Sequence, residues 1–203
     1  MSSVQSPIEE IRPHLVLLDL MLPGADGIEM LENNPGLSRR PVIFLSASGG
    51  ERTVARALEA GADDYIVKPF SPTELVARIQ AVLRRWTASG SAAPSEPYAS
   101  GELAVDYAGH RVTLAGRPVQ LTDIEYRTLV ELSANAGRVL THGELLRRVW
   151  GPAHSGRTGA VRSVIKNLRR KLGDDAASPA YIFNQPRVGY RMARAETPHA
   201  EAD

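Results

Sequence analysis

Three polar residues of this chain could together carry out chemistry on a phosphoryl group. Asp19, Ser46 and Lys68 each end or follow an apolar, strand-like run. Open α/β sheets place their chemistry at the carboxyl ends of buried parallel strands. There the carboxylate could attack phosphorus, while the hydroxyl and the ammonium group bind the phosphoryl oxygens. We therefore expect the three side chains to converge and to suit transient phosphorylation of Asp19.

The segments around these residues predict the elements that would position them. Segments with helical spacing of apolar residues separate the three strand-like runs. Alternation of strands and helices implies a parallel sheet with right-handed crossovers. The predicted strands are 14–20, 41–46 and 62–67, and the predicted helices are 26–34, 51–60 and 72–86.

The pattern changes after residues 87–97, which are small, polar and proline-bearing and are predicted to be a flexible linker. Short alternating segments then predict an antiparallel meander at 102–106, 111–115 and 118–121. A capping box at Thr122 and Glu125 predicts the start of a helix. Two further helices, 142–150 and 158–172, and a hairpin over 181–192 complete the predicted elements.

Charge is divided unevenly between the two halves of the 203-residue chain. Residues 1–97 contain 9 Lys and Arg against 12 Asp and Glu, whereas residues 98–194 contain 15 against 8. A basic half points to a polyanionic partner.

The chain has no cysteine, which excludes thiolate metal sites and cysteine nucleophiles. No apolar run approaches the roughly 20 residues that span a bilayer, so we expect a cytoplasmic protein that does not contact membranes.

The predicted helix 158–172 combines an apolar stripe with a polar face. Val161, Val164, Ile165, Leu168 and Leu172 form the stripe. A packed back and a cationic front suit insertion into the major groove of double-stranded DNA. A lone basic helix is more often a solvated surface helix, but this one is the third of three helices and precedes a hairpin. The residues predicted to contact DNA are Arg162, Ser163, Lys166, Asn167, Arg169, Arg170 and, in the hairpin, Arg187.

The first half resembles the receiver domain of two-component response regulators. The matching motifs are D-L-M-L-P-G-A-D-G from Asp19, L-S-A around Ser46, and G-A-D-D-Y-I-V-K-P-F ending at Phe70. The resemblance implies that Asp19 is the phosphoacceptor, Ser46 the switch hydroxyl, Lys68 the phosphate-binding lysine and Tyr65 the switch aromatic. It also implies a cis peptide bond at Lys68-Pro69 and Mg²⁺ bound by Asp19 and the backbone carbonyl of Met21. A haloacid-dehalogenase phosphatase would need aspartate at position 21, which is methionine.

A receiver domain also has acidic residues that the matching motifs here do not supply. In that family the first strand ends in an acidic pair that holds Mg²⁺, and Glu9 and Glu10 stand too close to the Asp19 strand to be that pair. We therefore expect 1–86 to be a partial receiver lacking its first two strands and first helix, from a shortened reading frame or a natural truncation. Phosphotransfer to Asp19 would then lose electrostatic compensation, and the strand 15–18 would form an open apolar edge.

The second half, a predicted domain at 98–194, resembles the winged-helix effector domain of the OmpR/PhoB subfamily over almost all of residues 100–192. The motifs include L-T-D-I-E-Y from Leu121, N-L-R-R-K-L from Asn167 and R-V-G-Y from Arg187. The resemblance implies a four-stranded sheet before the helices, a recognition helix at 158–172, and a loop at 151–157 near which RNA polymerase can bind. It also implies a homodimer through 51–86, with cross-subunit ion pairs formed by Asp63, Asp64, Glu74, Arg78 and Arg85.

The predicted fold is therefore an incomplete α/β, flavodoxin-like receiver, followed by an α+β winged helix-turn-helix domain and a disordered tail at 195–203. The predicted function is a non-enzymatic regulator that binds promoter DNA as a dimer, with phosphorylation in doubt. Two alternatives stay open: a switch that accepts phosphate on Asp19 from a histidine kinase, and an inert product of a truncated gene. Labelling by a small phosphodonor would separate the first alternative from the main prediction.

Overall fold

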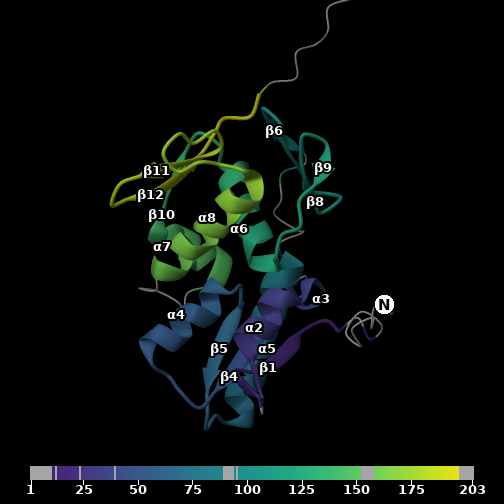
Figure 1. Cartoon of the computed structure of the whole chain (residues 1–203), viewed down its shortest axis with the longest axis vertical. Coiled ribbons are helices and arrows are strands. Elements are labelled where there is room, and N and C mark those ends of the chain that lie inside the picture. Colours follow the sequence, from purple (N-terminus) through teal and green to yellow (C-terminus); the bar gives the residue numbers. More distant parts are fainter. Residues whose placement is uncertain are drawn as a thin grey trace, which may run out of the picture.

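The computed structural model describes residues 11, 13–22, 24–38, 40–88, 94, 96–151 and 158–196. It has an N-terminal domain (residues 11–88) and a C-terminal domain (residues 96–196), which lie one above the other along the longest axis (Figure 1). Parts of the predicted linker and of the predicted tail lie outside the described residues. The segment 1–10 lies entirely outside them.

The N-terminal domain is built on a parallel sheet, as the alternation of strands and helices predicts. Its described strands are β1 (Val16–Asp19), β4 (Val42–Ser46) and β5 (Asp64–Val67), in the order β1-β4-β5. The register aligns Asp19 with Leu45 and Ser46 with Val67. Parallel pairing brings the three carboxyl ends to one edge of the sheet, which is where the polar residues of the sequence motif lie.

Helices cover both faces of this sheet. Successive residues of a strand point to opposite faces, and Phe44 and Tyr65 pack in one apolar cluster whereas Ile43 and Ile66 pack in another with Val82. The described helices are α2 (Gly27–Asn33), α3 (Pro35–Ser38), α4 (Glu51–Glu59) and α5 (Pro72–Ala88). The sequence pattern missed a short antiparallel pair, β2 (Met21–Leu22) and β3 (Ala25–Asp26).

Gly27 lets α2 start directly beneath the end of β1. A Cβ atom at this position would lie 2.4 Å from the backbone oxygen of Asp19 and 3.2 Å from Phe44. Such an approach is too close for any side chain, so only glycine fits. Asp26 caps the same helix by accepting a hydrogen bond of 2.8 Å from the Ile28 N–H. The A-D-G end of the first motif is thus explained by local packing as well as by family resemblance.

The C-terminal domain begins with a four-stranded antiparallel sheet in sequential order. The sequence pattern alone predicted three of its strands, and the family resemblance implied the fourth. The strand that the pattern did not predict is the first, Tyr98–Ser100, which is only three residues long. The strands are β6 (Tyr98–Ser100), β7 (Leu103–Asp106), β8 (Arg111–Leu114) and β9 (Arg117–Pro118).

Three helical segments and a second small sheet complete this domain. The segments are α6 (Asp123–Ala134), α7 (His142–Leu145) continued by the π-helical turn η1 (Leu146–Trp150), and α8 (Thr158–Leu172). The small sheet has the order β10 (Val139–Thr141), β12 (Gly189–Met192), β11 (Ile182–Gln185). The capping box of Thr122 and Glu125 is confirmed, and Thr141 with Glu144 forms a second one. The helix predicted over 142–150 is confirmed, and its second half has π-helical geometry.

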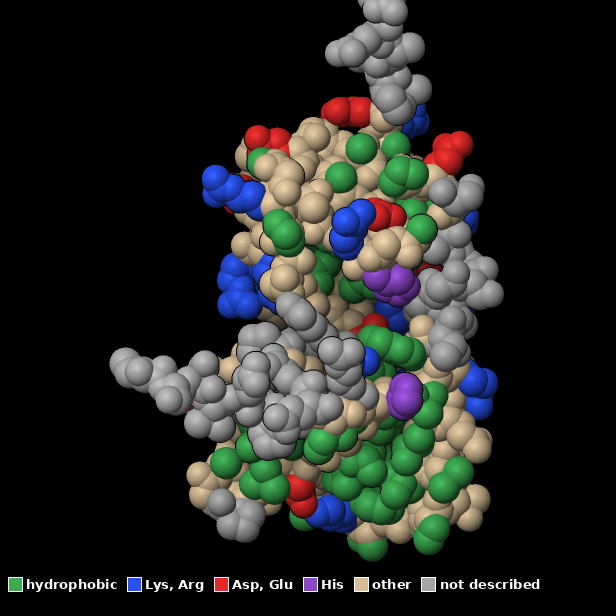
Figure 2. Space-filling model, turned by 90° about the vertical axis from the view of Figure 1, so that its right-hand side faces the viewer, with side chains coloured by type: hydrophobic (Ala, Val, Ile, Leu, Met, Phe, Trp, Pro, Cys, Tyr) green, Lys and Arg blue, Asp and Glu red, His purple; other side chains and the backbone are tan. Residues whose placement is uncertain are grey.

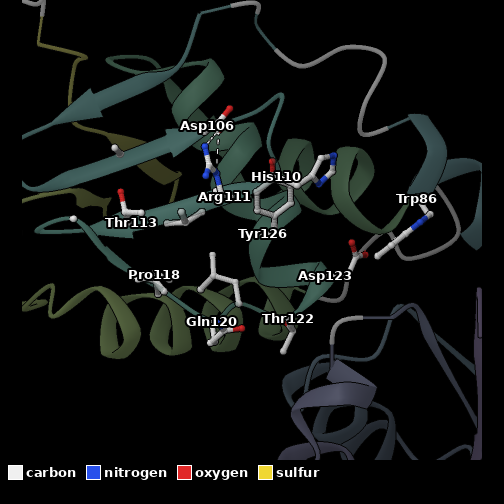
Figure 3. A pocket seen from close by; sticks show the side chains of 15 residues that line it. Trp86, Asp106, His110, Arg111, Thr113, Pro118, Gln120, Thr122, Asp123 and Tyr126 are labelled. Carbon is white, nitrogen blue, oxygen red and sulfur yellow. Dashed lines mark hydrogen bonds and ion pairs between the residues drawn. The ribbon is translucent and has the colours of Figure 1, made fainter. Parts of the chain in front are cut away.

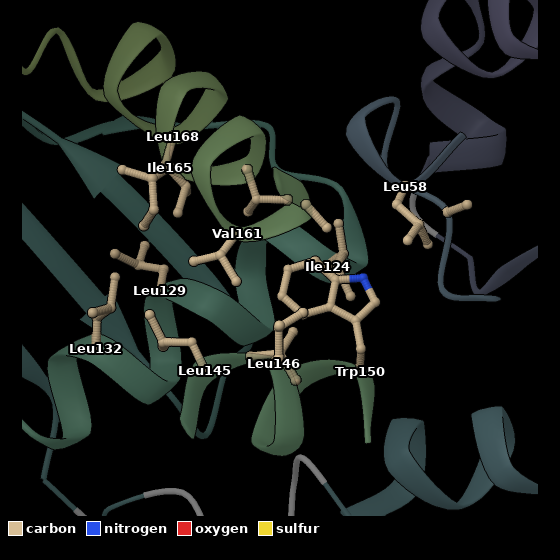
Figure 4. Packing of buried hydrophobic residues seen from close by; sticks show 14 of the residues in the cluster. Leu58, Ile124, Leu129, Leu132, Leu145, Leu146, Trp150, Val161, Ile165 and Leu168 are labelled. Carbon is tan, nitrogen blue, oxygen red and sulfur yellow. The ribbon is translucent and has the colours of Figure 1, made fainter. Parts of the chain in front are cut away.

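One cluster of buried apolar residues runs through both domains (Figure 4). Leu58 of α4 belongs to the same cluster as Ile124 and Trp150. Helices α4 and α8 also pack against one another. The two domains therefore share an interface with buried apolar contacts.

Strand β1 has a paired neighbour only on its β4 side among the described residues. Leu17 of this strand is 40% exposed, as expected for an apolar edge. Figure 2 shows hydrophobic side chains gathered on one face of the lower, N-terminal domain.

Candidate functional site

The structure brings two of the three strand-end residues into contact. Asp19 is the last residue of β1, and Lys68 follows the last residue of β5. The Lys68 ammonium group donates a hydrogen bond to Asp19 Oδ2 and forms an ion pair with it. Asp19 Oδ1 accepts a second hydrogen bond, of 3.1 Å, from the Met21 N–H. Both side chains are partly open to solvent, at 31% for Asp19 and 41% for Lys68.

Ser46 and Tyr65 lie on the neighbouring strands and make other contacts. Ser46 is buried, and its hydroxyl oxygen accepts a hydrogen bond of 3.1 Å from the Ser48 N–H. Its backbone oxygen accepts one of 2.7 Å from the Lys68 N–H. Tyr65 points inward, with its hydroxyl donating to the Ser48 carbonyl. The hydroxyl of Ser46 thus stands at the same sheet edge as Asp19 and Lys68, and Ser48 connects it to Tyr65. The cis peptide bond at Lys68-Pro69 is confirmed.

The surroundings of Asp19 favour its ionised form. The hydrogen bond from Lys68 lowers the pKa of Asp19 below its usual value, and the hydrogen bond from the Met21 N–H adds to this effect. An ionised carboxylate is the form that a nucleophilic role requires.

The described residues at this edge make only part of a magnesium site. Magnesium takes oxygen ligands, usually one or two carboxylates together with waters and phosphate oxygens. Among the described residues no three His, Cys, Asp or Glu side chains are grouped so that they could hold a metal ion. Asp19 is the one carboxylate of the predicted set, and the Met21 carbonyl is the other predicted ligand.

Helix α8 has the two-sided character that its sequence predicts. The whole predicted stripe is buried, with Ala160 as an addition that the pattern did not include. Arg162, Lys166 and Arg170 are exposed, whereas Ser163 and Asn167 are half-buried. The exposed cations stand four residues apart, so they share one face of the helix. Such a face can meet phosphates and base edges.

Arg169 differs from the other predicted DNA contacts. Its Nη2 donates a hydrogen bond of 2.6 Å to the Ile182 carbonyl, and its Nε lies 3.7 Å from Asp174 Oδ2. Its side chain is only 14% exposed. Asp174 in turn accepts hydrogen bonds from three backbone N–H groups between residues 180 and 182. Arg169 therefore fixes the hairpin to α8, and we leave it out of the candidate interface.

Arg187 lies at the tip of the hairpin formed by β11 and β12. It is exposed and adopts a positive φ of 64°. The turn hydrogen bond from the Val188 N–H to the Gln185 carbonyl, of 3.0 Å, closes the tip. Gly189 permits close packing behind it, since a Cβ there would lie 1.9 Å from the Leu140 oxygen. The turn between β11 and β12 thus presents the Arg187 cation to solvent.

The predicted dimer residues form ion pairs within the chain. Asp64 is buried and pairs with Arg78 at 3.3 Å, and Arg78 also contacts Glu74 at 3.1 Å. Arg85 is half-buried, and burial lowers the pKa of its guanidinium group. Asp63 is buried against the C-terminal domain, where Arg127 binds it. In this conformation Asp63 is not available to a second copy.

Arg127 is the important residue that sequence reasoning missed. Its side chain is 5% exposed and contacts acids of both domains, Asp63 and Asp123. Only the spacing of Asp123 and Arg127, four residues apart on α6, could have drawn attention to it. The pairing with Asp63 spans 64 positions in the sequence and has no local sequence signal.

The loop predicted to lie near RNA polymerase, 151–157, is described only at Gly151, and the rest of it lies outside the described residues.

A hollow of about 840 Å³ lies at the junction of the domains (Figure 3). Trp86 of α5 lines one side of it, and Asp123 and Tyr126 of α6 line another. His110 stacks on Tyr126, with ring centroids 4.9 Å apart. The domains are packed together on the side of α4 and α8, and the hollow lies between the end of α5 and the C-terminal domain.

Comparison with known proteins identifies both domains. The response regulator receiver domain matches residues 2–80, and the C-terminal domain of transcriptional regulatory proteins matches residues 116–192. The receiver match begins at residue 2, so it does not bear out the predicted loss of the first strands. The chain is therefore a response regulator that combines a receiver with a DNA-binding domain.

Curated relatives place the chain within that class. The DNA-binding response regulator MtrA of Mycolicibacterium smegmatis is 38% identical over 190 residues, covering 94% of this chain and 82% of MtrA. The transcriptional regulatory protein KdpE of Mycobacterium tuberculosis H37Rv is 41% identical over 181 residues, covering 89% of this chain and 79% of KdpE. The chain belongs to the OmpR/PhoB subfamily of two-component response regulators.

A solved structure supports the arrangement of elements. The structure of a RitR mutant matches with a TM-score of 0.69 and 27% identity, covering 92% of this chain and 82% of that one. The predicted fold class, a receiver with a parallel sheet followed by a winged-helix domain, is confirmed. No helix among the described residues is both long and apolar enough to cross a membrane.

Proposed function

We propose that this regulator binds promoter DNA as a homodimer through α8 and the hairpin tip. The observation that carries the proposal is the row of exposed cations Arg162, Lys166 and Arg170 on a helix whose other face is packed into the core. Arg187 at the tip would reach phosphates or the minor groove beside the helix. Ser163 and Asn167 add hydrogen-bonding groups on the same helix. The protein would act in the cytoplasm, without enzymatic activity of its own.

The first experiment determines whether these cations contact DNA. A preferred duplex would be selected from a random-sequence library with the full chain, and its affinity measured over a range of salt concentrations. Lys166→Ala and Arg170→Ala are expected to weaken binding and to reduce the slope of log K against log salt by about one each, because each loses a phosphate contact. Arg111→Ala, which removes an exposed cation of β8, is the control.

Two results would contradict this assignment. Unchanged affinity and salt slope in both α8 variants would exclude the exposed face of α8 as the interface. An equal loss in Arg111→Ala would indicate that net charge, and not the helix, determines binding.

We propose as a second candidate that Asp19 accepts a phosphoryl group from a sensor histidine kinase. The ion pair between Asp19 and Lys68 supports it, because the ammonium group could neutralise a phosphoryl oxygen after transfer. With Asp19 as the one carboxylate of the predicted set among the described residues, we expect weak Mg²⁺ binding at most. Mg²⁺-dependent labelling by acetyl phosphate, abolished by Asp19→Asn, is the expected result; no labelling of the folded chain would leave DNA binding as the sole proposed activity.

The dimer would form through α4, β5 and α5, where Asp64, Glu74, Arg78 and Arg85 lie. A solvent-accessible pair such as Arg78 and Glu74 contributes only about 0.2–1 kcal/mol, so it would determine the partner more than the affinity. RNA polymerase remains a proposed partner through the loop that follows Gly151.

A further inference from the structure

Strand β11 is the outer strand of the small sheet that carries the hairpin tip. Among the described residues it pairs only with β12, which pairs with β10 on its other side. The Tyr181 carbonyl, just before β11, accepts a hydrogen bond of 2.8 Å from the Ala193 N–H on the side of β12. Because backbone groups alternate between the two sides of a strand, the N–H and the carbonyl of Ile182 face the open edge.

Two side chains at the end of α8 occupy this open edge as a neighbouring strand would. Asp174 Oδ2 accepts a hydrogen bond of 3.0 Å from the Ile182 N–H, and Arg169 Nη2 donates one of 2.6 Å to the Ile182 carbonyl. A carboxylate and a guanidinium group thus supply the acceptor and the donor that a paired residue supplies in a sheet. At Ile182 the end of α8 therefore takes the place of the next strand.

Asp174 also binds the chain that leads into β11. Its Oδ1 accepts hydrogen bonds of 2.7 and 3.0 Å from the N–H groups of Ala180 and Tyr181. Its own N–H donates a hydrogen bond of 2.9 Å to the Arg169 carbonyl in the last turn of α8. The Asp174 side chain is fully buried. A buried carboxylate that accepts from three N–H groups beside a guanidinium group has little freedom to move, so the base of the hairpin has a fixed position relative to α8.

The direction of the hairpin at its base determines where its tip lies. A strand rises about 3.3 Å per residue, so the turn after Gln185 stands roughly 10 Å from Ile182. A change of about 20° in the direction of the hairpin would move the tip by roughly 3–4 Å. Such a displacement is larger than a hydrogen bond from Arg187 to a phosphate oxygen can tolerate.

We propose that Asp174 is a positioning residue for DNA recognition: with Arg169, it determines where Arg187 meets the duplex relative to the contacts of α8. The inference rests on the proposed DNA-binding role of α8 and of the hairpin tip. Asp174 is buried, so it acts through Arg187 and not on DNA itself. Its replacement should therefore remove the contribution of Arg187 to binding and leave the contribution of Lys166.

The test is a double-mutant cycle with the full chain and the duplex selected with the wild type. Asp174→Asn keeps the size of the side chain but puts an amide donor in place of one acceptor oxygen. Asp174→Asn and Arg187→Ala are each expected to weaken binding about fivefold or more. The variant with both changes should bind within about twofold of Arg187→Ala alone, whereas the losses of Asp174→Asn and Lys166→Ala should multiply within about twofold.

Two further variants complete the experiment. Asp175→Asn removes the same charge from the exposed neighbouring residue and should bind as the wild type does. Arg169→Met keeps the aliphatic stem and removes the donor to the Ile182 carbonyl. Its combination with Arg187→Ala should also bind no more weakly than Arg187→Ala alone, within about twofold. Arg169→Met decides the question if circular dichroism shows that Asp174→Asn does not fold.

Three results distinguish the positioning role from the function on which it rests. Losses of Asp174→Asn and Arg187→Ala that multiply would overturn the proposal, since Asp174 would then act on another contact. Equal affinities of Asp174→Asn and Asp175→Asn, with Arg187→Ala weakened, would overturn it while leaving the tip in the interface. If Arg187→Ala binds as tightly as the wild type, the proposed DNA contact of the tip fails, and the inference fails with it.

Discussion

At the scale of single residues, the ion pair of Asp19 and Lys68 determines the charge at the end of the sheet. Lys68 is the main reason that the pKa of Asp19 is lowered. A lowered pKa means that the contribution of this pair to stability is present above the ordinary pKa of an aspartate and is lost as the pH falls through the lowered value. The carboxylate is therefore ionised throughout the neutral range.

Replacing Lys68 should remove most of the lowering of the Asp19 pKa. In Lys68→Met the pKa of Asp19 is expected to rise toward its usual value, because the largest stabilising hydrogen bond is removed. A pH titration followed by carboxyl carbon NMR would measure it. Arg56→Met, which removes the cation paired with Asp26 at 3.5 Å, should leave the Asp19 titration unchanged. A titration of Asp19 that is the same in Lys68→Met and in the wild type would argue against the ion pair in solution.

Sequence reasoning succeeded where the relevant contacts are local or follow from the sheet. Asp19 and Lys68 could be placed together because the carboxyl ends of parallel strands share one edge. The stripe on α8 followed from helical periodicity. The roles of Arg127 and Arg169 could not be predicted, because each depends on a partner that is brought close only by tertiary packing. A basic residue on a helix has no sequence signal that separates a DNA contact from a buried ion pair.

At the scale of elements, α8 is held by its buried stripe and not by its charged face. Leu168 is fully buried in the cluster that also contains Val161 and Leu129. Thr122, Glu125 and Lys171 connect the start of α6 to the last turn of α8, through the capping box and an ion pair. The stripe therefore determines where the exposed cations are presented.

Truncating the stripe should cost stability, whereas truncating the charged face should not. Leu168→Ala is expected to lower the free energy of unfolding by about 2–5 kcal/mol, because it leaves a cavity in a packed core. Lys166→Ala, on the exposed face of the same helix, should change it by no more than about 0.5 kcal/mol. Urea denaturation followed by circular dichroism measures both values. Similar losses in the two variants would show that the two faces of α8 are not distinct.

At the scale of the whole molecule, the two domains are linked by apolar packing and by buried charge. The shared cluster extends from Leu58 to Trp150, and Arg127 contacts acids on both sides of the junction. Breaking a buried ion pair by removing one partner typically costs about 3–5 kcal/mol. The domains should therefore lose their structure together.

Calorimetry can measure this coupling. The wild-type chain is expected to unfold in a single transition, with matching calorimetric and van't Hoff enthalpies. Asp63→Lys should split it into two transitions, because a cation opposite Arg127 separates the domains by repulsion before either unfolds. Two transitions already present in the wild type would mean that the interface contributes little to stability in solution.

The position of Arg127 also has a consequence for how this protein can evolve. One guanidinium in the C-terminal half is shared between Asp123 of its own domain and Asp63 of the other. A chimera that joined this C-terminal half to a receiver without an acid at position 63 would leave Arg127 with only Asp123 and the Val149 carbonyl as partners. We therefore expect positions 63 and 127 to change together among relatives that share this contact.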